Sequence, residues 1–136
     1  MKVAVSLLSA LFIAGCATPF DDLLNNRFAE IVAEPVTEQY TGVRTGTSGP
    51  WLVTVSVHED GTGVYCSSWN ERNFVGNVKM ANGVIYFQDG SKSRVSLDGS
   101  VLIADYDGAG AAQIRFVPDA GLKEASPYCK NQMSNQ

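Results

Sequence analysis

Histidine and cysteine, on which many catalytic and metal sites depend, are scarce in this sequence of 136 residues. It contains one histidine, His58, and three cysteines. It has no Gly-x-Ser-x-Gly or Ser-x-x-Lys motif, and no CxxC or HxxxH spacing that would suit zinc. A catalytic site needs a nucleophile or an acid beside a group that tunes it. The sequence therefore predicts a protein that is not an enzyme and that uses no cofactor or metal.

Clusters of positive charge are also lacking. The chain has 10 Lys and Arg against 14 Asp and Glu, which gives a formal net charge of −4. Nucleic-acid binding depends on concentrated positive charge, so we expect no nucleic-acid partner. Attraction to anionic lipid headgroups is excluded for the same reason. With 45% hydrophobic and 18% charged residues, the composition is that of one globular domain.

One long apolar run is present, and it is short for a membrane span. Met1-Lys2 is a positive start, and residues 3–14 are almost entirely apolar. About a dozen residues rise roughly 18 Å as a helix, well below the roughly 30 Å of a bilayer core. Residues 1–15 are therefore predicted to be a signal peptide.

The end of this run carries a recognisable motif. Ile13-Ala14-Gly15-Cys16 resembles the bacterial lipobox. The resemblance implies that Cys16 becomes the lipidated first residue of the mature protein, with the membrane as its partner through that lipid. Ala17, in place of aspartate, implies an outer-membrane address in the cell envelope. Several acyl chains on one residue are enough for stable anchoring.

The other two cysteines, Cys66 and Cys129, are predicted to form a disulfide. Lipidation would consume Cys16, and two thiols that remain outside the cytoplasm are expected to pair. A bridge closing so long a loop stabilises a fold by about 4 kcal/mol. Two free thiols or a metal-binding pair are the alternatives.

Residues 16–35 are predicted to be the lipidated N-terminus followed by one amphipathic helix over 19–33. Thr18 is a suitable N-cap, and Pro19 suits the first helical position. Apolar residues recur at helical spacing, namely Leu23, Leu24, Phe28, Ile31 and Val32. Glu34-Pro35 is expected to end the helix.

Residues 36–129 are predicted to form an antiparallel β-domain. Trp51, Val53, Val55 and Val57 alternate with more polar residues, and short β-rich runs follow. The runs are Val64–Trp69, Phe74–Met80, Val84–Gln88, Ser91–Leu97, Val101–Tyr106 and Ala111–Val117. Turn dipeptides separate most of them, at Asp60-Gly61, Asn82-Gly83, Asp89-Gly90, Asp98-Gly99 and Asp107-Gly108.

This pattern predicts a mainly β fold, a small up-and-down barrel or a sandwich of seven or eight short strands, with the barrel favoured. A short turn is expected at Asp119–Ala125, and pairing of Cys129 with Cys66 would fix the C-terminal segment on the third strand. The last residues, 130–136, are predicted to be a polar, frayed tail.

Few side chains remain as candidates for a site. His58 lies near a strand end beside Glu59 and Asp60, where a solvated histidine is the simpler interpretation. Asp89, Asp98 and Asp107 each lie in a turn, which explains them without acid–base chemistry. Asp105-Tyr106-Asp107-Gly108 resembles the start of a calcium loop, but the glutamate expected at the twelfth position is Phe116.

Aromatic residues are the other candidates, as lining of a ligand pocket or as core. They are Trp51, Tyr65, Trp69, Phe74, Tyr86, Phe87, Tyr106 and Phe116. Because eight short strands leave little interior space, we expect most of them to fill the core.

Two family resemblances extend beyond the lipobox. Gly61-x-Gly63-x-x-Cys66, Ile85-Tyr86, Asp89-Gly90 and the closing Ala125-Ser126-Pro127-Tyr128-Cys129 resemble a group of short Gram-negative lipoproteins. That group implies no activity. A weaker similarity is to membrane-bound lysozyme inhibitors, which share a compact barrel and a C-terminal cysteine. Tyr65-Cys66 lacks their Tyr-x-Cys spacing, and their inhibitory loop has no counterpart here.

The leading hypothesis is therefore a non-enzymatic envelope lipoprotein that is a structural or protein-interaction module with an envelope protein as partner. The first alternative is a barrel that binds a small ligand, and the second is an inhibitor of a lysozyme-like hydrolase. An interaction module should expose an apolar or aromatic patch, whereas a ligand carrier should contain a pocket of several hundred Å³.

Overall fold

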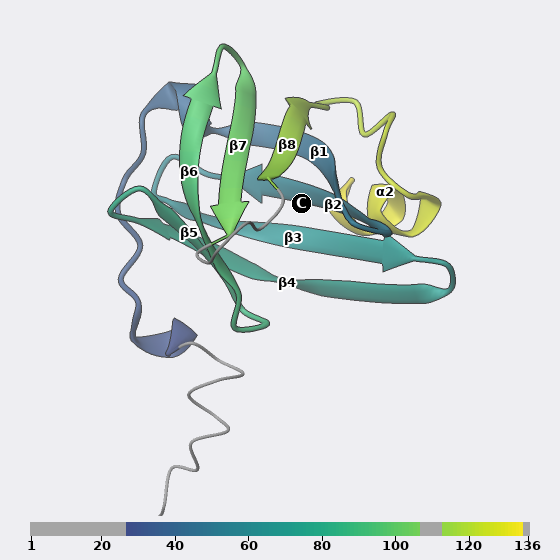
Figure 1. Ribbon diagram of the computed structural model, residues 1–136, viewed down its shortest axis with the longest axis horizontal. Helices are drawn as coiled ribbons and strands as arrows, with labels where there is room; N and C mark the ends of the chain where they lie inside the picture. The colour runs from purple at the N-terminus through teal and green to yellow at the C-terminus, as the bar shows by residue number, and fades with distance from the viewer. Residues whose placement is uncertain (1–26, 107–112, 135–136) are drawn as a thin grey trace, which may run out of the picture.

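The computed structural model describes residues 27–106 and 113–134, whose eight strands form a closed antiparallel barrel (Figure 1). Each strand pairs with the next, and β8 closes the barrel against β1. The strands are β1 Gly42–Ser48, β2 Trp51–Val57, β3 Thr62–Trp69, β4 Arg72–Ala81, β5 Val84–Phe87, β6 Lys92–Asp98, β7 Val101–Tyr106 and β8 Gln113–Pro118. The predicted small barrel is confirmed, and β1 is the strand that the predicted runs omit.

The interior of the barrel is filled by apolar side chains that alternate along the strands. On β2 the predicted inward residues Val53, Val55 and Val57 are all buried. They belong to one core cluster with Tyr65, Val78, Met80, Ile85, Phe87, Leu102, Ala104, Ile114 and Phe116. Period-two alternation places every second residue on the inner face, which is why the sequence alone predicts which residues of β2 are buried.

One end of the barrel is closed by Arg44, which is 5% exposed on β1. Its guanidinium donates to four backbone carbonyls. The distances are 3.1 Å from Nε to Ser100, 2.9 Å and 3.1 Å from Nη1 to Tyr40 and Thr41, and 2.7 Å from Nη2 to Gln39. Burial lowers the pKa of Arg44, but an arginine stays charged at neutral pH. This side chain ties the 3₁₀ helix η2 (Glu38–Tyr40) to the β6–β7 turn, and we call this the closed end.

The amphipathic helix predicted for 19–33 is wrong in its described part. Residues 19–26 lie outside the described residues, and in the remaining part of the predicted helix, residues 27–33, only the 3₁₀ helix η1 (Phe28–Glu30) forms. The chain then runs extended, because tertiary hydrogen bonds replace helical ones. The Glu34 N–H donates to the Met80 carbonyl at 2.8 Å and the Val36 N–H to the Glu59 carbonyl at 3.0 Å. Val32, expected on the apolar stripe, is 79% exposed.

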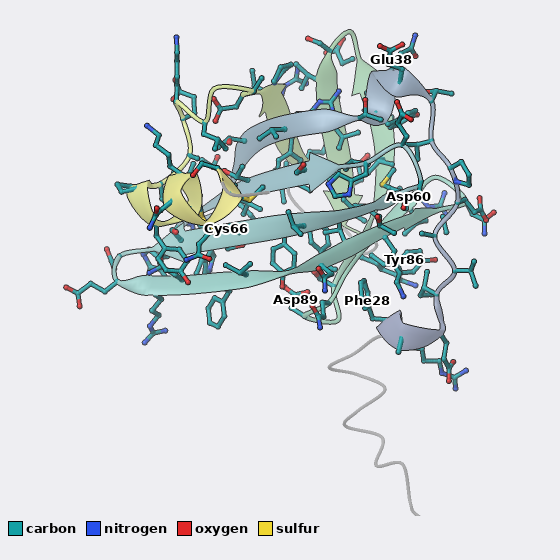
Figure 2. All side chains as sticks on the ribbon, turned by 180° about the vertical axis from the view of Figure 1, so that it is seen from behind. Phe28, Glu38, Asp60, Cys66, Tyr86 and Asp89 are labelled. Atoms are coloured by element: carbon teal, nitrogen blue, oxygen red, sulfur yellow. A yellow bond between two sulfur atoms is a disulfide. The ribbon has the colours of Figure 1, made fainter. Side chains whose placement is uncertain are left out.

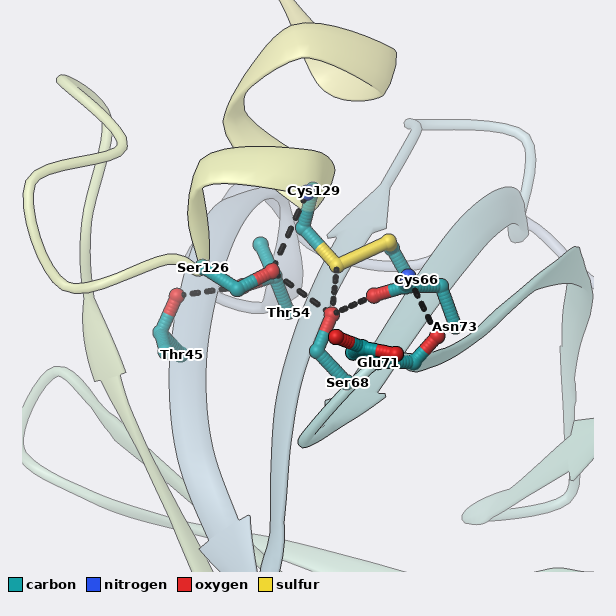
Figure 3. Close-up of a disulfide and its surroundings, with 8 residues drawn as sticks. All are labelled: Thr45, Thr54, Cys66, Ser68, Glu71, Asn73, Ser126 and Cys129. Carbon is teal, nitrogen blue, oxygen red and sulfur yellow. Dashed lines mark hydrogen bonds between the residues drawn. A yellow bond between two sulfur atoms is a disulfide. The ribbon is translucent and has the colours of Figure 1, made fainter.

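A C-terminal α-helix, α2 (Pro127–Met133), replaces much of the predicted polar tail. Ser126 caps it by accepting the Cys129 N–H at 3.1 Å, and Pro127 takes the first helical position. The structure joins Cys129 to Cys66 of β3 in a disulfide (Figure 3). Met133 is buried beside this bridge. The frayed tail is therefore a wrong prediction for residues 130–133, because the bridge and Met133 hold them on the barrel.

A buried polar group fixes the segment between β8 and α2. One carboxylate oxygen of Asp119 accepts the Thr45 hydroxyl at 2.9 Å, and the other accepts the Lys123 N–H at 2.7 Å. Thr45 also shares a hydrogen bond of 2.8 Å with Thr54, which is fully buried. The expected turn after Asp119 thus covers the outer face of β1 and β2.

In the part of the chain that the structure describes, none of the helices is long and apolar enough to cross a membrane.

Candidate functional site: the open end of the barrel

The end of the barrel opposite Arg44 carries the longest projection of the fold. There β1 passes to β2 through a short turn, and β3 and β4 form a hairpin closed by the pair Trp69↔Arg72. Figure 1 shows this hairpin extending past the neighbouring strands. The turn is tight because Asn70 adopts a positive φ of 54°, a conformation that asparagine tolerates. We call this the open end.

A pocket of about 350 Å³ opens at this end. Its lining residues are Ser48, Trp51, Val53, Tyr65, Ser67, Phe74 and Asp89. Small-molecule sites usually span about 300–1,000 Å³, so this pocket is at the lower limit. Deeper in the barrel, Phe116, Ile85 and Leu102 are fully buried in the core. The pocket is therefore a shallow depression in the mouth, above a filled interior.

Three aromatic side chains cluster at the open end, and we call them the aromatic surface: Trp51 and Phe74, which line the pocket, and Trp69, which packs against Trp51. The Trp51 ring lies 5.6 Å from Trp69 and 5.5 Å from Phe74, measured between centroids. Trp69 is 38% exposed and Phe74 57% exposed. The Arg72 guanidinium lies 5.8 Å from the Trp69 centroid, within cation–π range. Contiguous exposed aromatics of this kind are typical of interaction sites.

Tyr65 contributes the most perturbed group of the pocket. Burial, followed by the negative charge of Asp89, raises the pKa of Tyr65 to about 12. The ring packs edge-on against Phe87, with 5.2 Å between centroids. The phenol therefore keeps its proton at neutral pH, and its hydroxyl donates to the Asp89 carboxylate rather than acting as a base.

The ring of Tyr65 fits here because its cross-strand partner is Gly76. A Cβ at Gly76 would lie 2.6 Å from the Tyr65 ring, too close for carbon atoms. Gly76→Ala is therefore expected to lower the free energy of unfolding by about 1–3 kcal/mol, as overpacking usually does. Gly121→Ala is the matched control, because its Cβ would meet its nearest neighbours at 3.8 Å. Urea unfolding of both variants measures the difference, and equal losses would contradict the packing argument.

Replacement of Asp89 by asparagine is expected to lower the pKa of Tyr65 from about 12 towards its ordinary value of 10.0, because a negative charge near the phenolate is removed. The turn should survive. Asp89 Oδ1 accepts the Ser91 N–H at 2.9 Å and the Ser91 hydroxyl at 2.6 Å, and an asparagine oxygen can accept the same two bonds. Ultraviolet titration of the tyrosines measures this pKa.

The raised pKa also sets the sign of a pH dependence. Between about pH 10 and 12 the folded state holds the Tyr65 proton that the unfolded state has lost, so this contribution to stability is present below pH 10 and declines as pH rises through that window. Asp89→Asn should make this decline smaller, because it lowers the folded-state pKa of Tyr65 towards the unfolded-state value at which the decline begins. An unchanged titration curve would contradict the role of Asp89.

The titratable residues considered as catalytic or metal-binding candidates in the sequence do not cluster at the open end. His58 is exposed in the β2–β3 turn, at the closed end. Asp60 accepts the hydroxyl and the N–H of Thr62, and these bonds lower the pKa of Asp60. Asp98 pairs with Arg115 at 3.0 Å. Figure 2 shows Asp60 and Asp89 well apart. These carboxylates make turn or surface contacts, as expected.

Some predicted residues cannot be placed. Cys16, Asp107 and Gly108 lie outside the described residues. Among the side chains of residues 27–106 and 113–134, no group of three or more His, Cys, Asp or Glu is arranged to hold a metal ion.

Some of the candidate aromatic residues lie in the core, and others are exposed at the open end. Phe87 and Phe116 are core, and Tyr65 belongs to both core and pocket. Trp69 and Phe74 are exposed, contrary to the expectation that most would fill the core. The reason is that the β3–β4 hairpin projects beyond the interior, so alternation there no longer implies burial.

Comparison with known proteins gives the relatives of this fold. A family model described as "Bacterial lipocalin LPS transport optimiser YedD" matches residues 25–133. The lipoprotein YedD from Klebsiella pneumoniae subsp. pneumoniae superposes with a TM-score of 0.54 at 15% identity, covering 80% of this chain and 93% of that one. A lipocalin lipoprotein affecting virulence in Streptococcus pneumoniae gives a TM-score of 0.51 at 21% identity, with 63% and 97% covered. At these identities the structural likeness concerns the fold. No curated protein matches the chain.

Proposed function

Because this chain belongs to the YedD family of bacterial lipoproteins, we propose that it is a non-enzymatic protein-interaction module that assists LPS (lipopolysaccharide) transport in the cell envelope. The aromatic surface at the open end is the docking site. The link to LPS comes from the description of the family, and the location of the docking site comes from the exposed rings of Trp69 and Phe74.

The main support for this proposal is the exposure of the aromatic surface to solvent. Of the six large hydrophobic residues exposed in the described part of the chain, three belong to the β3–β4 hairpin: Trp69, Phe74 and Val75. Tryptophan and arginine are enriched among the residues that contribute most to protein–protein binding. Trp69 with Arg72 stacked over it has that composition. Burying these rings against a partner would remove a large apolar area from water.

The proposal includes the anchor. Lipidation of Cys16 and attachment to the outer membrane would hold the open end close to envelope partners and raise their effective concentration. A clickable fatty-acid label is expected to mark the wild-type protein and leave the Cys16→Ser variant unmarked. Equal labelling of the two would remove the anchor from the proposal.

We propose that the protein is not an enzyme because of the titratable groups that line the open-end pocket. Its titratable groups are Tyr65, which keeps its proton, and Asp89, which accepts two hydrogen bonds from Ser91. The single histidine lies at the other end of the barrel. The described lining of the pocket contains no histidine, cysteine or lysine, and its one carboxylate, Asp89, is held by Ser91.

The docking proposal is tested by variants of exposed residues that the fold does not need. Trp69→Ser with Phe74→Ser removes two rings of the aromatic surface, and Val117→Ser removes an apolar side chain of similar exposure, 51%, on β8. In cells that lack the native protein, we expect the double variant to lose the ability to restore the rate at which newly made LPS reaches the cell surface. The Val117→Ser variant should restore it fully. Full restoration by the double variant would refute the docking site.

A small apolar ligand in the open-end pocket is the second candidate function, favoured by its volume of about 350 Å³ and its apolar walls. It makes a different prediction. Protein isolated from envelopes should then carry a bound small molecule in native mass spectra, and Val53→Trp, which fills the floor of the pocket, should remove that molecule.

A further inference from the structure

Strand β4 is longer than its neighbour β5, and this leaves part of one edge uncovered. β4 spans Arg72–Ala81, but its pairing with β5 begins at Val78↔Phe87 and ends at Ala81↔Val84. Next to this ladder, Asn77 is covered by Gln88. The Gln88 N–H donates to the Asn77 carbonyl at 3.0 Å, and the Asn77 N–H donates to Gln88 Oε1 at 3.0 Å. In the described part of the chain, no strand pairs with the β5 side of residues 72–76.

The directions of the backbone groups on this edge follow from Asn77. In an antiparallel ladder the N–H and C=O of one residue point to one neighbour strand, and those of the next residue point to the other. Asn77 points towards the β5 side, so Val75 and Asn73 do as well. Arg72, Phe74 and Gly76 point to β3, where the register pairs them with Trp69, Ser67 and Tyr65. The N–H and C=O groups of Asn73 and Val75 therefore face outward at strand spacing.

Apolar side chains flank this edge on both faces of the sheet. Phe74 lies on the inner face, 57% exposed, and Val75 lies on the outer face, 49% exposed. Proteins usually protect such edges with lysine, proline, a bulge or a covering segment. The segment Arg-Asn-Phe-Val-Gly has no proline or lysine, and its one charged residue, Arg72, is stacked on Trp69. Among the described residues, nothing therefore prevents this edge from pairing with another strand.

We propose that residues 72–76 of β4 receive an extended strand from a partner polypeptide, which adds to the sheet at the open end. Rows of N–H and C=O groups at the strand repeat are matched by another extended polypeptide and not by a lipid or sugar. The added strand would place one side chain against Phe74 and the aromatic surface, and the next against Val75. The inference rests on the proposed protein-interaction function and specifies its mode.

The added strand belongs to a different protein, because a second copy of this chain could offer only the same short edge of β4, whereas the other described strands are paired around the closed barrel. Two outward-facing residues, Asn73 and Val75, offer few hydrogen bonds, so the partner strand must also cover the adjacent aromatic surface. A strand added along this edge places a side chain against Phe74 on the inner face, and the Phe74 ring in turn contacts Trp51, with 5.5 Å between centroids. Pairing between two copies is kept as an outcome of the test.

The test uses the full-length lipoprotein in intact envelopes, with the photo-crosslinking residue p-benzoyl-phenylalanine in place of Phe74. This background is combined with Val75→Pro or with Val75→Thr. Proline removes the outward N–H, and it breaks no bond to β3 because the Val75 N–H points away from that strand. Threonine keeps the N–H and suits a strand. Both variants should keep the disulfide and a similar melting temperature, which the purified proteins will report.

We expect one adduct with a second protein in the Val75→Thr variant, and a yield about tenfold lower in the Val75→Pro variant, the change in affinity expected from losing an edge hydrogen bond and admitting a clash. Equal yields in the two variants would overturn strand addition while leaving the aromatic surface as a docking site. An adduct of twice the mass of the chain would overturn it in favour of self-pairing. No adduct in either variant would also overturn it. If Trp69→Ser with Phe74→Ser then restored LPS transport, the proposed function would fail as well.

Discussion

Replacement of both Cys66 and Cys129 by alanine is expected to lower the free energy of unfolding by about 4 kcal/mol, close to what a loop of this length gives in the chain-entropy model. The two residues are 63 positions apart. The bridge fixes α2 on β3, and both cysteines are fully buried. Its loss should therefore free the C-terminal helix as well as enlarge the unfolded ensemble.

Urea unfolding measures this loss, and a reductant supplies the internal control. Reduction should destabilise the wild-type protein by a similar amount and leave the double-alanine variant unchanged. A loss below about 1 kcal/mol would mean that α2 is held by Met133 and Ser126 and not by the bridge, contrary to the expected size of the effect.

Removal of the Arg44 guanidinium is the second large effect expected. Arg44→Met keeps much of the length and the apolar stem but leaves four backbone carbonyls without their donor, and we expect a loss of about 3 kcal/mol. Arg44→Lys should recover little of it. One ammonium group cannot match a planar guanidinium that bonds Gln39, Tyr40 and Ser100 in different directions.

Arg115→Met is the matched control for Arg44. Arg115 donates to Asp98 at 3.0 Å, but the two side chains are 53% and 66% exposed. An ion pair so exposed contributes about 0–1 kcal/mol. If thermal unfolding gave equal losses for Arg44→Met and Arg115→Met, the closed end would not depend on Arg44 in the way described.

The β-barrel was predictable because its strands obey two local rules. Period-two alternation marked the inner face of β2, and turn dipeptides such as Asn82-Gly83 marked the hairpins, where both residues adopt positive φ. Strand β1 escaped these rules. Its inward positions are Arg44 and Gly46 instead of aliphatic residues. Gly46 is required there because a Cβ would lie 2.5 Å from the Arg115 carbonyl oxygen.

The two wrong predictions about helices, a helix over residues 19–33 and a frayed C-terminal tail, have a common physical cause. In both segments tertiary contacts outweigh local propensity. The apolar stripe ending at Val32 predicted a helix, but the hydrogen bonds of Glu34 and Val36 to the barrel hold that segment in an extended conformation. Conversely, α2 is short and polar. Its signal was Ser126-Pro127, a capping residue followed by proline at the first helical position.

The candidate site was only partly predictable from the sequence. The aromatic residues were recognised as either core or lining, but no local pattern indicated that the β3–β4 hairpin would project and expose Trp69 and Phe74. That exposure depends on β5 being only four residues long, Val84–Phe87, which leaves the first half of β4 without a paired strand on its β5 side among the described residues. Such a mismatch in strand length becomes visible only when the register of the whole sheet is known.

The two ends of the barrel have different roles in this account. The closed end is built for stability, with Arg44 satisfying backbone carbonyls and η2 covering the core. The open end exposes apolar rings and a strand edge that no described strand pairs with, features that stability alone would not favour. The fold therefore concentrates its proposed interaction at one end.

Hydroxyl-radical footprinting of the unmodified protein tests the central claim most directly. Oxidation of Trp69, Phe74 and Tyr128 is compared between intact envelopes and the purified protein. Tyr128 is the reference, because it is 41% exposed on α2, outside the aromatic surface. We predict that Trp69 and Phe74 are oxidised several-fold more slowly in envelopes while Tyr128 is oxidised equally in both. Equal oxidation of all three residues in both settings would contradict docking at the open end.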